Sequence, residues 1–203
     1  MGNVETIQSL TTRPGVAALI QHLQSAGGFF NEPQQSANIA PTVQRYLKTD
    51  PRLGRVHFRK NLNTVGNYNP SSDTVSVGVN NPAVVGHELG HARNLRDAPT
   101  YSKLVQAVQN LANINTAIAL PAMLAIRALV SNPDTQREIF NIASGASAML
   151  AAPGLVEEVA ASVDAVKHAP DKLQAIKTLA PAFLTHAVHS LAPTAIYQFG
   201  KHI

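Results

Sequence analysis

Hydrophobic positions follow two different periods in the first half of the chain. Apolar residues recur at helical spacing in Val16–Ser25, which ends at two glycines, and again in Pro41–Leu47. The period then becomes two, because apolar and polar residues alternate in Arg55–Asn61 and in Asp73–Val79, on either side of the turn-forming segment Asn67–Ser72. The pattern predicts two helices followed by a small antiparallel sheet.

Beyond Thr100 the pattern is helical and almost free of charge. Three stretches contain no Asp, Glu, Lys or Arg: Leu104–Ile126, Ile139–Val156 and Thr178–Gly200. The first two predict an antiparallel helical hairpin that turns at the polar segment Ser131–Asp134. All three approach the length of a membrane span, but their Asn, Gln, Ser and His side chains make them less apolar than such a span. Buried helices of a soluble layer and a membrane-inserted hairpin both fit this pattern.

The patterns before and after Thr100 together predict an α+β fold that is mostly α, in a single domain over residues 1–203. Residues 1–100 would supply the N-terminal helices, the sheet and one further helix. Residues 101–203 would form a helical layer.

The amino-acid composition excludes several kinds of functional site. The chain has no cysteine, which excludes disulfides, thiolate-bound metals, iron–sulfur clusters and a cysteine nucleophile. Its net charge of +4 is not gathered in any basic run, so we expect no nucleic-acid partner. Met1–Ile20 has neither the basic start nor the apolar core of a secretory signal, whereas Gly2 fits the loose pattern for N-myristoylation.

The pentapeptide His87-Glu88-Leu89-Gly90-His91 carries the clearest chemistry. Residues four apart share one face of a helix, so the imidazoles of His87 and His91 can reach one metal ion. Glu88 points about 100° away around the helix and can hydrogen-bond a water on that ion without being a ligand. Gly90 is unfavourable inside a helix by about 1 kcal/mol, which indicates the close approach of another backbone. The motif predicts a Zn²⁺ site with Glu88 as the general base.

Glu158 is the first candidate for the third ligand that a catalytic zinc requires. It stands with Glu157 in an apolar, alanine-rich helix, where a carboxylate is unfavourable unless something binds it. Adjacent helical residues point about 100° apart, so only one of the two acids can be a ligand. Alternatively, both acids lie in the first turn of a helix that begins after Pro153-Gly154, where negative charge favours the helix dipole.

Asp97 and three histidines are the other candidates. Asp97 follows His91 at the spacing of the metzincin pattern HExxHxxGxx(H/D), with Asn94 in place of the glycine. An ion pair with Arg93 is the other interpretation of Asp97. The histidines are His168 and the pair His186 and His189, which could instead, like Tyr197 or Tyr101, polarise a substrate carbonyl.

The order of these residues resembles the gluzincin plan. An HExxH motif, two charge-poor helices and Glu158-x-x-Ala161-Ser162 are similar to the membrane metallopeptidases related to the CAAX-prenyl proteases and the heat-shock membrane protease. The resemblance, which covers about Asp73–Asp164, implies that Glu158 is the third zinc ligand and that Ala161 is a small packing position. Ser162 stands where the family has an Asp that orients a ligating histidine, which implies altered support for that histidine. In zinc peptidases the strand before the motif lies along the substrate, which implies an edge strand near Val75–Val79.

Two functions fit these features. One is a zinc-dependent metalloendopeptidase of zincin-like fold that acts on a peptide or protein substrate, with zinc-bound water activated by Glu88. The other is a catalytically weak or inactive zincin-fold structural protein of a virion or a membrane-associated assembly, similar to metallopeptidase-like proteins of bacteriophages. The protein could accordingly be located in the cytoplasm, at a membrane or in a virion.

Overall fold

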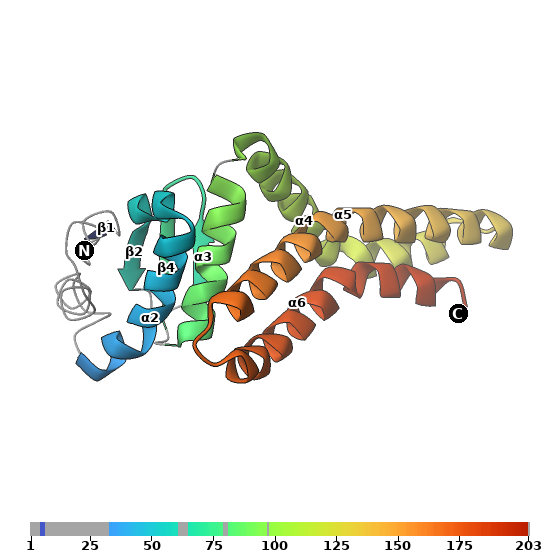
Figure 1. Ribbon diagram of the computed structural model, residues 1–203. Helices are drawn as coiled ribbons and strands as arrows, with labels where there is room; N and C mark the ends of the chain where they lie inside the picture. The colour runs from blue at the N-terminus through green and yellow to red at the C-terminus, as the bar shows by residue number, and fades with distance from the viewer. Residues whose placement is uncertain (1–4, 7–32, 61–64, 79–80, 97, 203) are drawn as a thin grey trace. The chain divides into compact units, whose positions relative to one another are not determined.

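The computed structural model describes residues 5–6, 33–60, 65–78, 81–96 and 98–202 of the 203-residue chain. The elements in chain order are β1 (Glu5–Thr6), α2 (Pro33–Thr49), the 3₁₀ helix η2 (Pro51–Arg55), β2 (His57–Lys60), β3 (Gly66–Asn69), β4 (Thr74–Val77), α3 (Pro82–Arg96), α4 (Pro99–Leu129), α5 (Pro133–His168) and α6 (Lys172–Gly200). The fold is therefore α+β and mostly helical, as predicted (Figure 1). The helix predicted at Val16–Ser25 lies outside the described residues.

The chain forms two compact units. The first comprises Met1–Pro99 together with Glu158–Pro181, and the second comprises Thr100–Glu157 together with Ala182–Ile203. The change of pattern near residue 100 marks the first boundary. Glu158–Pro181, which follow the hairpin, belong to the first unit, whereas the other residues after Pro99 belong to the second.

The sheet of the first unit is mixed rather than antiparallel. Its strand order is β1-β2-β4-β3, and β4 runs parallel to β2 and antiparallel to β3. The chain returns through β3 before it enters β4, which is what allows β2 and β4 to run in the same direction. Since β4 has a neighbour on each side, the prediction of an edge strand at Val75–Val79 is wrong, and β3 forms that edge.

β3 occupies a segment whose asparagines and proline predict a turn. Tyr68 is buried and its hydroxyl donates a hydrogen bond to Asp73 Oδ1 at 2.9 Å, whereas Asn67 and Asn69 are exposed. The turn comes after Asn69, whose side chain accepts a hydrogen bond from the Ser71 amide at 2.9 Å, and it ends at Asp73 with a φ of 47°. One buried aromatic side chain between two solvent-facing asparagines is a strand pattern that the turn-forming residues conceal.

α2 begins at Pro33, eight residues before the predicted start, and contains Pro41. A proline inside a helix removes one backbone hydrogen bond, so tertiary packing has to hold the turns on either side. Ala40, Val43 and Tyr46 recur every three residues and are fully buried. The Tyr46 hydroxyl donates to the Gly86 carbonyl oxygen at 2.7 Å and thereby joins α2 to α3.

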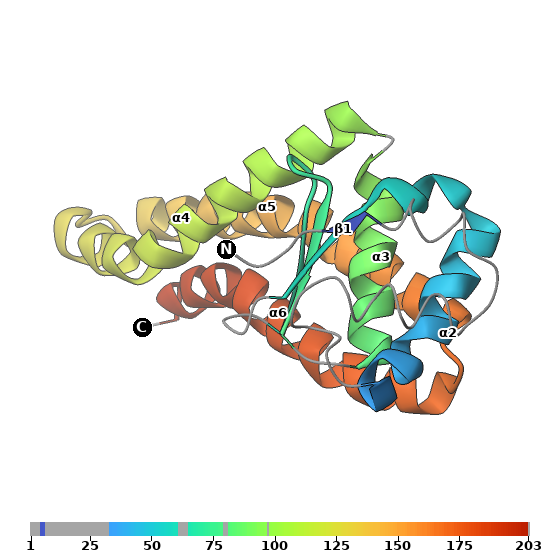
Figure 2. The ribbon, with the colours of Figure 1, turned by 90° about the vertical axis from the view of Figure 1, so that its left-hand side faces the viewer.

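α3 begins at Pro82, whose fixed φ suits the first helical turn. Asn81 caps the helix, because its side-chain oxygen accepts a hydrogen bond from the Ala83 amide at 2.9 Å. One face of α3 packs on β3 and β4, and another packs on α2 (Figure 2). The HExxH motif therefore lies on a helix, as the spacing of its histidines predicts.

Small residues let α3 and the last turns of α5 approach closely within the first unit. A Cβ at Gly90 would lie 2.8 Å from the Ala161 carbonyl oxygen, and a Cβ at Gly86 would lie 3.4 Å from Ala165 Cβ. The backbone whose approach Gly90 indicates is therefore that of α5 at Ala161. We call these four residues, which are spaced four apart on each helix, the glycine–alanine contact.

The second unit contains α4, the first part of α5 and the second part of α6, which lie side by side (Figures 1 and 2). α4 and α5 form the predicted antiparallel hairpin, and Asn115 Nδ2 donates to Ser147 Oγ at 2.8 Å between them. α6 joins this pair through Gln198 Nε2, which donates to Ser144 Oγ at 2.6 Å. No described residue beyond Thr100 lies in a strand.

α5 is continuous through Pro153 and Gly154. The alternative in which a helix begins after these two residues is therefore wrong. Glu157 and Glu158 lie inside a helix, more than five turns from its first residue, and the helix dipole at its N-terminus does not explain them.

Candidate metal site

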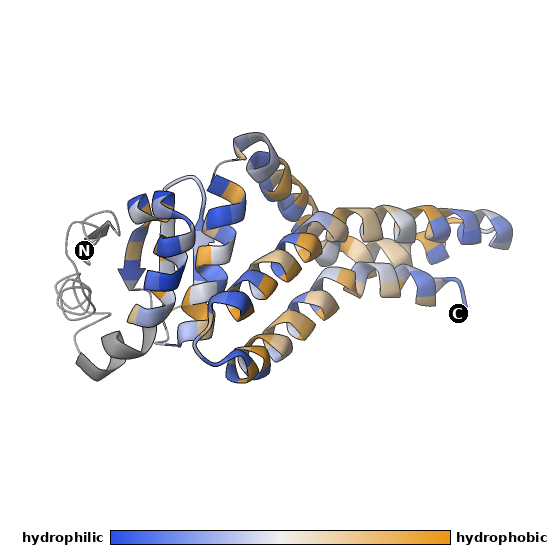
Figure 3. Ribbon diagram, viewed as in Figure 1, coloured by the Kyte–Doolittle hydropathy of each residue, from blue (hydrophilic) through white to orange (hydrophobic). Residues whose placement is uncertain are grey.

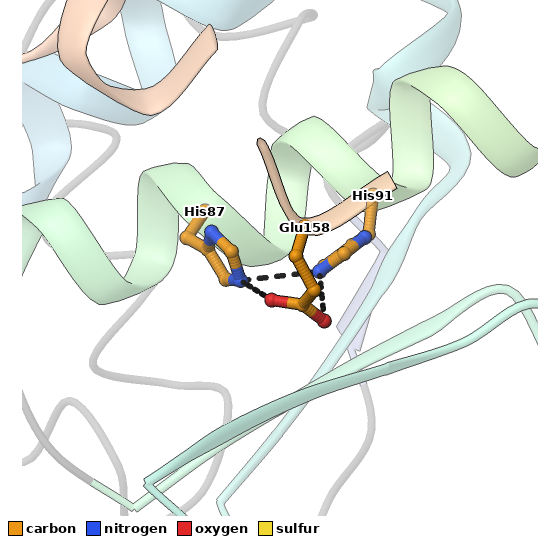
Figure 4. Close-up of side chains that lie close together, drawn as sticks. All are labelled: His87, His91 and Glu158. Carbon is orange, nitrogen blue, oxygen red and sulfur yellow. Dashed lines mark hydrogen bonds and ion pairs between the residues drawn. The ribbon is translucent and has the colours of Figure 1, made fainter. Parts of the chain in front are cut away.

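Three side chains converge between α3 and α5 in the first unit (Figure 4). His87 and His91 lie one turn apart on α3, with their Nε2 atoms 3.1 Å from one another. Glu158 reaches toward both from α5, with Oε2 at 3.2 Å from His87 Nε2 and Oε1 at 3.5 Å from His91 Nε2. Within the described part of the chain, this is the one group of three or more His, Asp and Glu side chains whose donor atoms meet in this way.

The spacing of these donor atoms fits a metal ion. Ligands at about 2.0–2.1 Å from a tetrahedral ion stand about 3.3 Å from one another, close to the three separations of 3.1–3.5 Å. Two imidazoles and a carboxylate also form a donor set that transition metals take in proteins. The cluster could therefore hold a metal ion, with both histidines and Glu158 as its ligands.

The glycine–alanine contact positions these ligands. His87 and His91 each follow one of its glycines, and Glu158 precedes Ala161 by three residues. Because the backbones of α3 and α5 approach closely there, side chains one position along can meet without either helix bending. Longer residues at the contact would separate the two halves of the cluster.

Ser162 supports His87 from the side opposite the cluster. Its Oγ lies 3.2 Å from His87 Nδ1, one helical turn beyond Glu158. When Nδ1 carries the ring proton and donates to this hydroxyl, the lone pair of Nε2 faces the other ligands. Serine is shorter and neutral, so it orients the ring without the charge that the aspartate of the gluzincin pattern would bring.

Glu158 is ionised over a wide pH range. Burial by itself would raise the pKa of Glu158, but hydrogen bonds from His87 and His91 and the charges of those rings outweigh it. The pKa of this carboxyl therefore lies well below the ordinary value. A permanently negative oxygen pair beside two imidazole nitrogens is suited to a cation.

Glu88 has the opposite environment. It is buried, and burial raises the pKa of Glu88 above the ordinary carboxyl value, an effect to which the nearby Glu158 adds and which the two histidines oppose. The Tyr68 backbone donates a hydrogen bond to the Glu88 carboxylate, and a Cβ at Gly66 would lie 2.5 Å from Glu88 Oε1. β3 therefore holds this carboxylate in a fixed position, while the hydrogen bond from Tyr68 opposes the rise in pKa that burial causes.

The contributions of Gly66 and Tyr68 have no signal in the sequence. Gly66 precedes the segment that predicts a turn and Tyr68 lies in it. Gly66 acts on Glu88 by leaving space for its carboxylate, and Tyr68 acts through a backbone hydrogen bond. The sequence pattern does not indicate a role for Asp164 either. In the structure Arg93 Nη1 lies 2.9 Å from Asp164 Oδ1, and this ion pair joins α3 to α5. Arg93 thus pairs with Asp164, a residue that local spacing does not indicate.

The converging group contains none of the other candidates that the sequence suggests, and two of these lie outside the described residues. Asp97 and Gly2 are not among the described residues. His168 stacks on Tyr46, with ring centroids 4.2 Å apart, and its Nε2 lies 3.1 Å from Thr49 Oγ1. Glu157, which is buried, and Tyr101, Tyr197, His186 and His189 belong to the second unit, and the converging group contains none of them.

No family model, curated protein or solved structure matches the chain. The structure therefore shows an α+β protein that is mostly helical and carries a His-His-Glu group that could hold a metal ion.

Proposed function

We propose that the protein is a zinc-dependent metallopeptidase of the gluzincin type. The observation that carries this proposal is the convergence of His87, His91 and Glu158, at 3.1–3.5 Å, beside a buried glutamate in the second position of an HExxH motif. Two histidines and one glutamate with an open fourth position are the ligand set of a catalytic zinc. Because the chain has no cysteine, it offers a metal no thiolate donor.

A bound Zn²⁺ would supply a Lewis acid that polarises a carbonyl and lowers the pKa of a bound water to about 7. Glu88 then accepts the proton of the attacking water and delivers it to the leaving amine. Its raised pKa favours this role, because a base with a higher proton affinity removes a proton more readily. The hydrogen bond from the Tyr68 backbone keeps the carboxylate in place during both transfers.

The substrate in this proposal is an extended peptide that pairs with the edge of β3. β4 is excluded from that role because β2 and β3 flank it. β3 lies against α3, and its residues Gly66 and Tyr68 touch Glu88. A strand added at this edge would bring a scissile carbonyl near the cluster.

The decisive test replaces Glu88 by Gln in the full-length protein. We expect the purified variant to bind one Zn²⁺ per chain, like the wild type, and to lose about 10²- to 10⁴-fold in kcat/KM on a mixture of quenched fluorescent peptides. Metal content by mass spectrometry and cleavage by fluorescence are measured on one preparation. Loss of zinc from the variant, or full activity, would each overturn the role given to Glu88.

The replacement of aspartate by Ser162 favours the second candidate, a zincin-fold structural protein with little or no activity. A neutral hydroxyl supports His87 less strongly than a carboxylate. A wild type that binds zinc and cleaves no peptide, while its Ser162→Asp variant does, would identify the chain as such a protein.

A further inference from the structure

The large apolar side chains of the second unit point outward. Leu111, Ile118 and Leu124 on α4, Ile142 and Met149 on α5, and Val188 on α6 have 51–72% of their surface exposed. Hydrophobic residues follow the length of these helices, whereas hydrophilic ones dominate the sheet and α3 (Figure 3). Single exposed apolar residues are ordinary on a soluble protein, but this many large ones on three helices of one unit are unusual.

The interior of the same helices is made of small and polar residues. Ala119, Ser144, Ser147 and Ala151 are buried there, and hydrogen bonds from Asn115 to Ser147 and from Gln198 to Ser144 connect the helices. A cluster of Met123, Phe140 and Tyr197 provides larger apolar contacts near one end. Small residues with interhelical hydrogen bonds inside, and large aliphatic residues outside, reverse the arrangement of a soluble helical bundle and match that of helices packed in lipid.

The lengths and flanking charges match a bilayer. Pro99–Leu129 and Pro133–His168 are long and apolar enough to cross a membrane, yet only 11% and 22% of their most apolar stretches are buried. The charge-free run of α4 lies between Lys103 and Arg127, a rise of about 34 Å against a hydrocarbon core of about 30 Å. A core helix of a soluble protein would be mostly buried instead.

Several polar side chains of these helices have partners or line a cavity in the bundle, while Asn110, Asn113 and His189 are exposed. Gln106 donates to Ser102 Oγ at 3.2 Å. Gln109, Asn113, His186 and His189 line one cavity of about 60 Å³. Polar groups that face a shared cavity are tolerated at membrane depth, whereas scattered ones that face lipid are not.

We propose that α4, α5 up to Val156 and the second part of α6 are embedded in a lipid bilayer, with acyl chains covering their exposed aliphatic side chains. The partner is the hydrocarbon core itself, because the apolar surface covers all three helices rather than one face. This inference is independent of the metal site, since none of its residues is a ligand. It makes the protein an integral membrane protein.

The test uses the absence of native cysteine. Leu120, an exposed residue inside the charge-free run of α4, is replaced by Cys in the full chain and labelled with a polarity-sensitive fluorophore. Ser131→Cys, between α4 and α5, and Ser71→Cys, in the turn before β4, are the matched controls. The labelled proteins are reconstituted in phosphatidylcholine–phosphatidylglycerol vesicles.

We expect lipids with nitroxides on their acyl chains to quench the fluorescence of the Leu120 label, and iodide in the buffer to leave it unchanged. We expect iodide to quench the Ser71 and Ser131 labels on the side of the bilayer that it reaches, and the nitroxide lipids to leave them unchanged. The unlabelled wild type should stay with the vesicles during alkaline carbonate extraction. Quenching of the Leu120 label by iodide, or a monodisperse soluble wild type in plain buffer, would overturn the proposal. A soluble oligomer that shields Leu120 would overturn it as well, in favour of a second copy as the covering partner. Zinc content of the same samples keeps this outcome separate from that of the metal site.

Discussion

Glu157 and Glu158 are neighbours in the sequence, but only Glu158 belongs to the group that could hold a metal ion. Glu158 Oε2 and Oε1 lie within 3.5 Å of the two histidines, while Glu157 points about 100° away around α5. Both are substantially shielded from solvent, so burial alone does not distinguish them. The direction of the side chain on the helix places only Glu158 in the group that could hold a metal ion.

This difference gives a matched pair of variants. We expect Glu158→Gln to weaken Zn²⁺ binding by at least about 100-fold, because even the partners of ligands contribute about 10- to 100-fold. Glu157→Gln should leave the affinity unchanged, and competition with a chromophoric chelator measures both. Equal effects of the two substitutions would contradict the assignment of Glu158.

Gly66 controls the position of Glu88 without a side chain of its own. A Cβ there would meet Glu88 Oε1 at 2.5 Å and Val84 Cγ1 at 2.8 Å. We expect Gly66→Ala to displace the carboxylate and to lower kcat/KM by about 100-fold, the effect of misplacing a catalytic group by about 1 Å. Zinc content should not change. Val65→Ala, at an exposed neighbour, should have little effect on either measurement.

At the scale of elements, the cluster depends on how closely α3 and α5 approach. Gly90 and Ala161 are in backbone contact, and Arg93 bonds Asp164 one turn further on. Arg45 of α2 donates to the Ala169 carbonyl oxygen at 2.6 Å, which ties the end of α5 to the same unit. α5 is thus held to α3 at two levels and to α2 at a third, and the cluster lies at the closest contact between α3 and α5.

Gly90→Ala should therefore damage both stability and the site. An extra methyl group within 2.8 Å of the Ala161 carbonyl oxygen forces the helices apart, and overpacking of this kind costs about 1–3 kcal/mol. We expect a lower unfolding temperature and weaker zinc binding. Gly145→Ala, where a Cβ would meet nothing within 4 Å, is the control and should lower neither. A Gly90→Ala protein that binds zinc normally would show that the contact does not position the ligands.

At the scale of the whole molecule, an ion bound at the cluster would link parts of the chain that are distant in sequence. An ion that binds the folded chain alone stabilises it by about 2.7 kcal/mol when its free concentration is 100 times the dissociation constant. We expect added Zn²⁺ to raise the unfolding temperature and a chelator to reverse this. His87→Ala should show neither change. A zinc-induced shift of equal size in that variant would point to binding elsewhere.

The sequence predicts the parts of this molecule that depend on local spacing. His87 and His91 share a face because they are four residues apart, and the charge-free runs of α4 and α5 define a hairpin. β3 escapes prediction because its asparagines favour turns in isolation, and pairing with β4 overrides that preference. The mixed order of the sheet depends on contacts between distant residues, which local pattern does not contain, whereas the return of Glu158 to the two histidines follows from its prediction as the third ligand.

The 67 positions from His91 to Glu158 also mean that the ribosome adds the glutamate some time after the two histidines. At about 5–20 residues per second, a ribosome needs roughly 3–13 s to add them. During that interval the nascent chain carries both histidines and Glu88 but lacks the carboxylate that completes the group. The proposed peptidase would therefore be inert while it is being translated, because its third ligand would be added only after the whole helical hairpin has been synthesised.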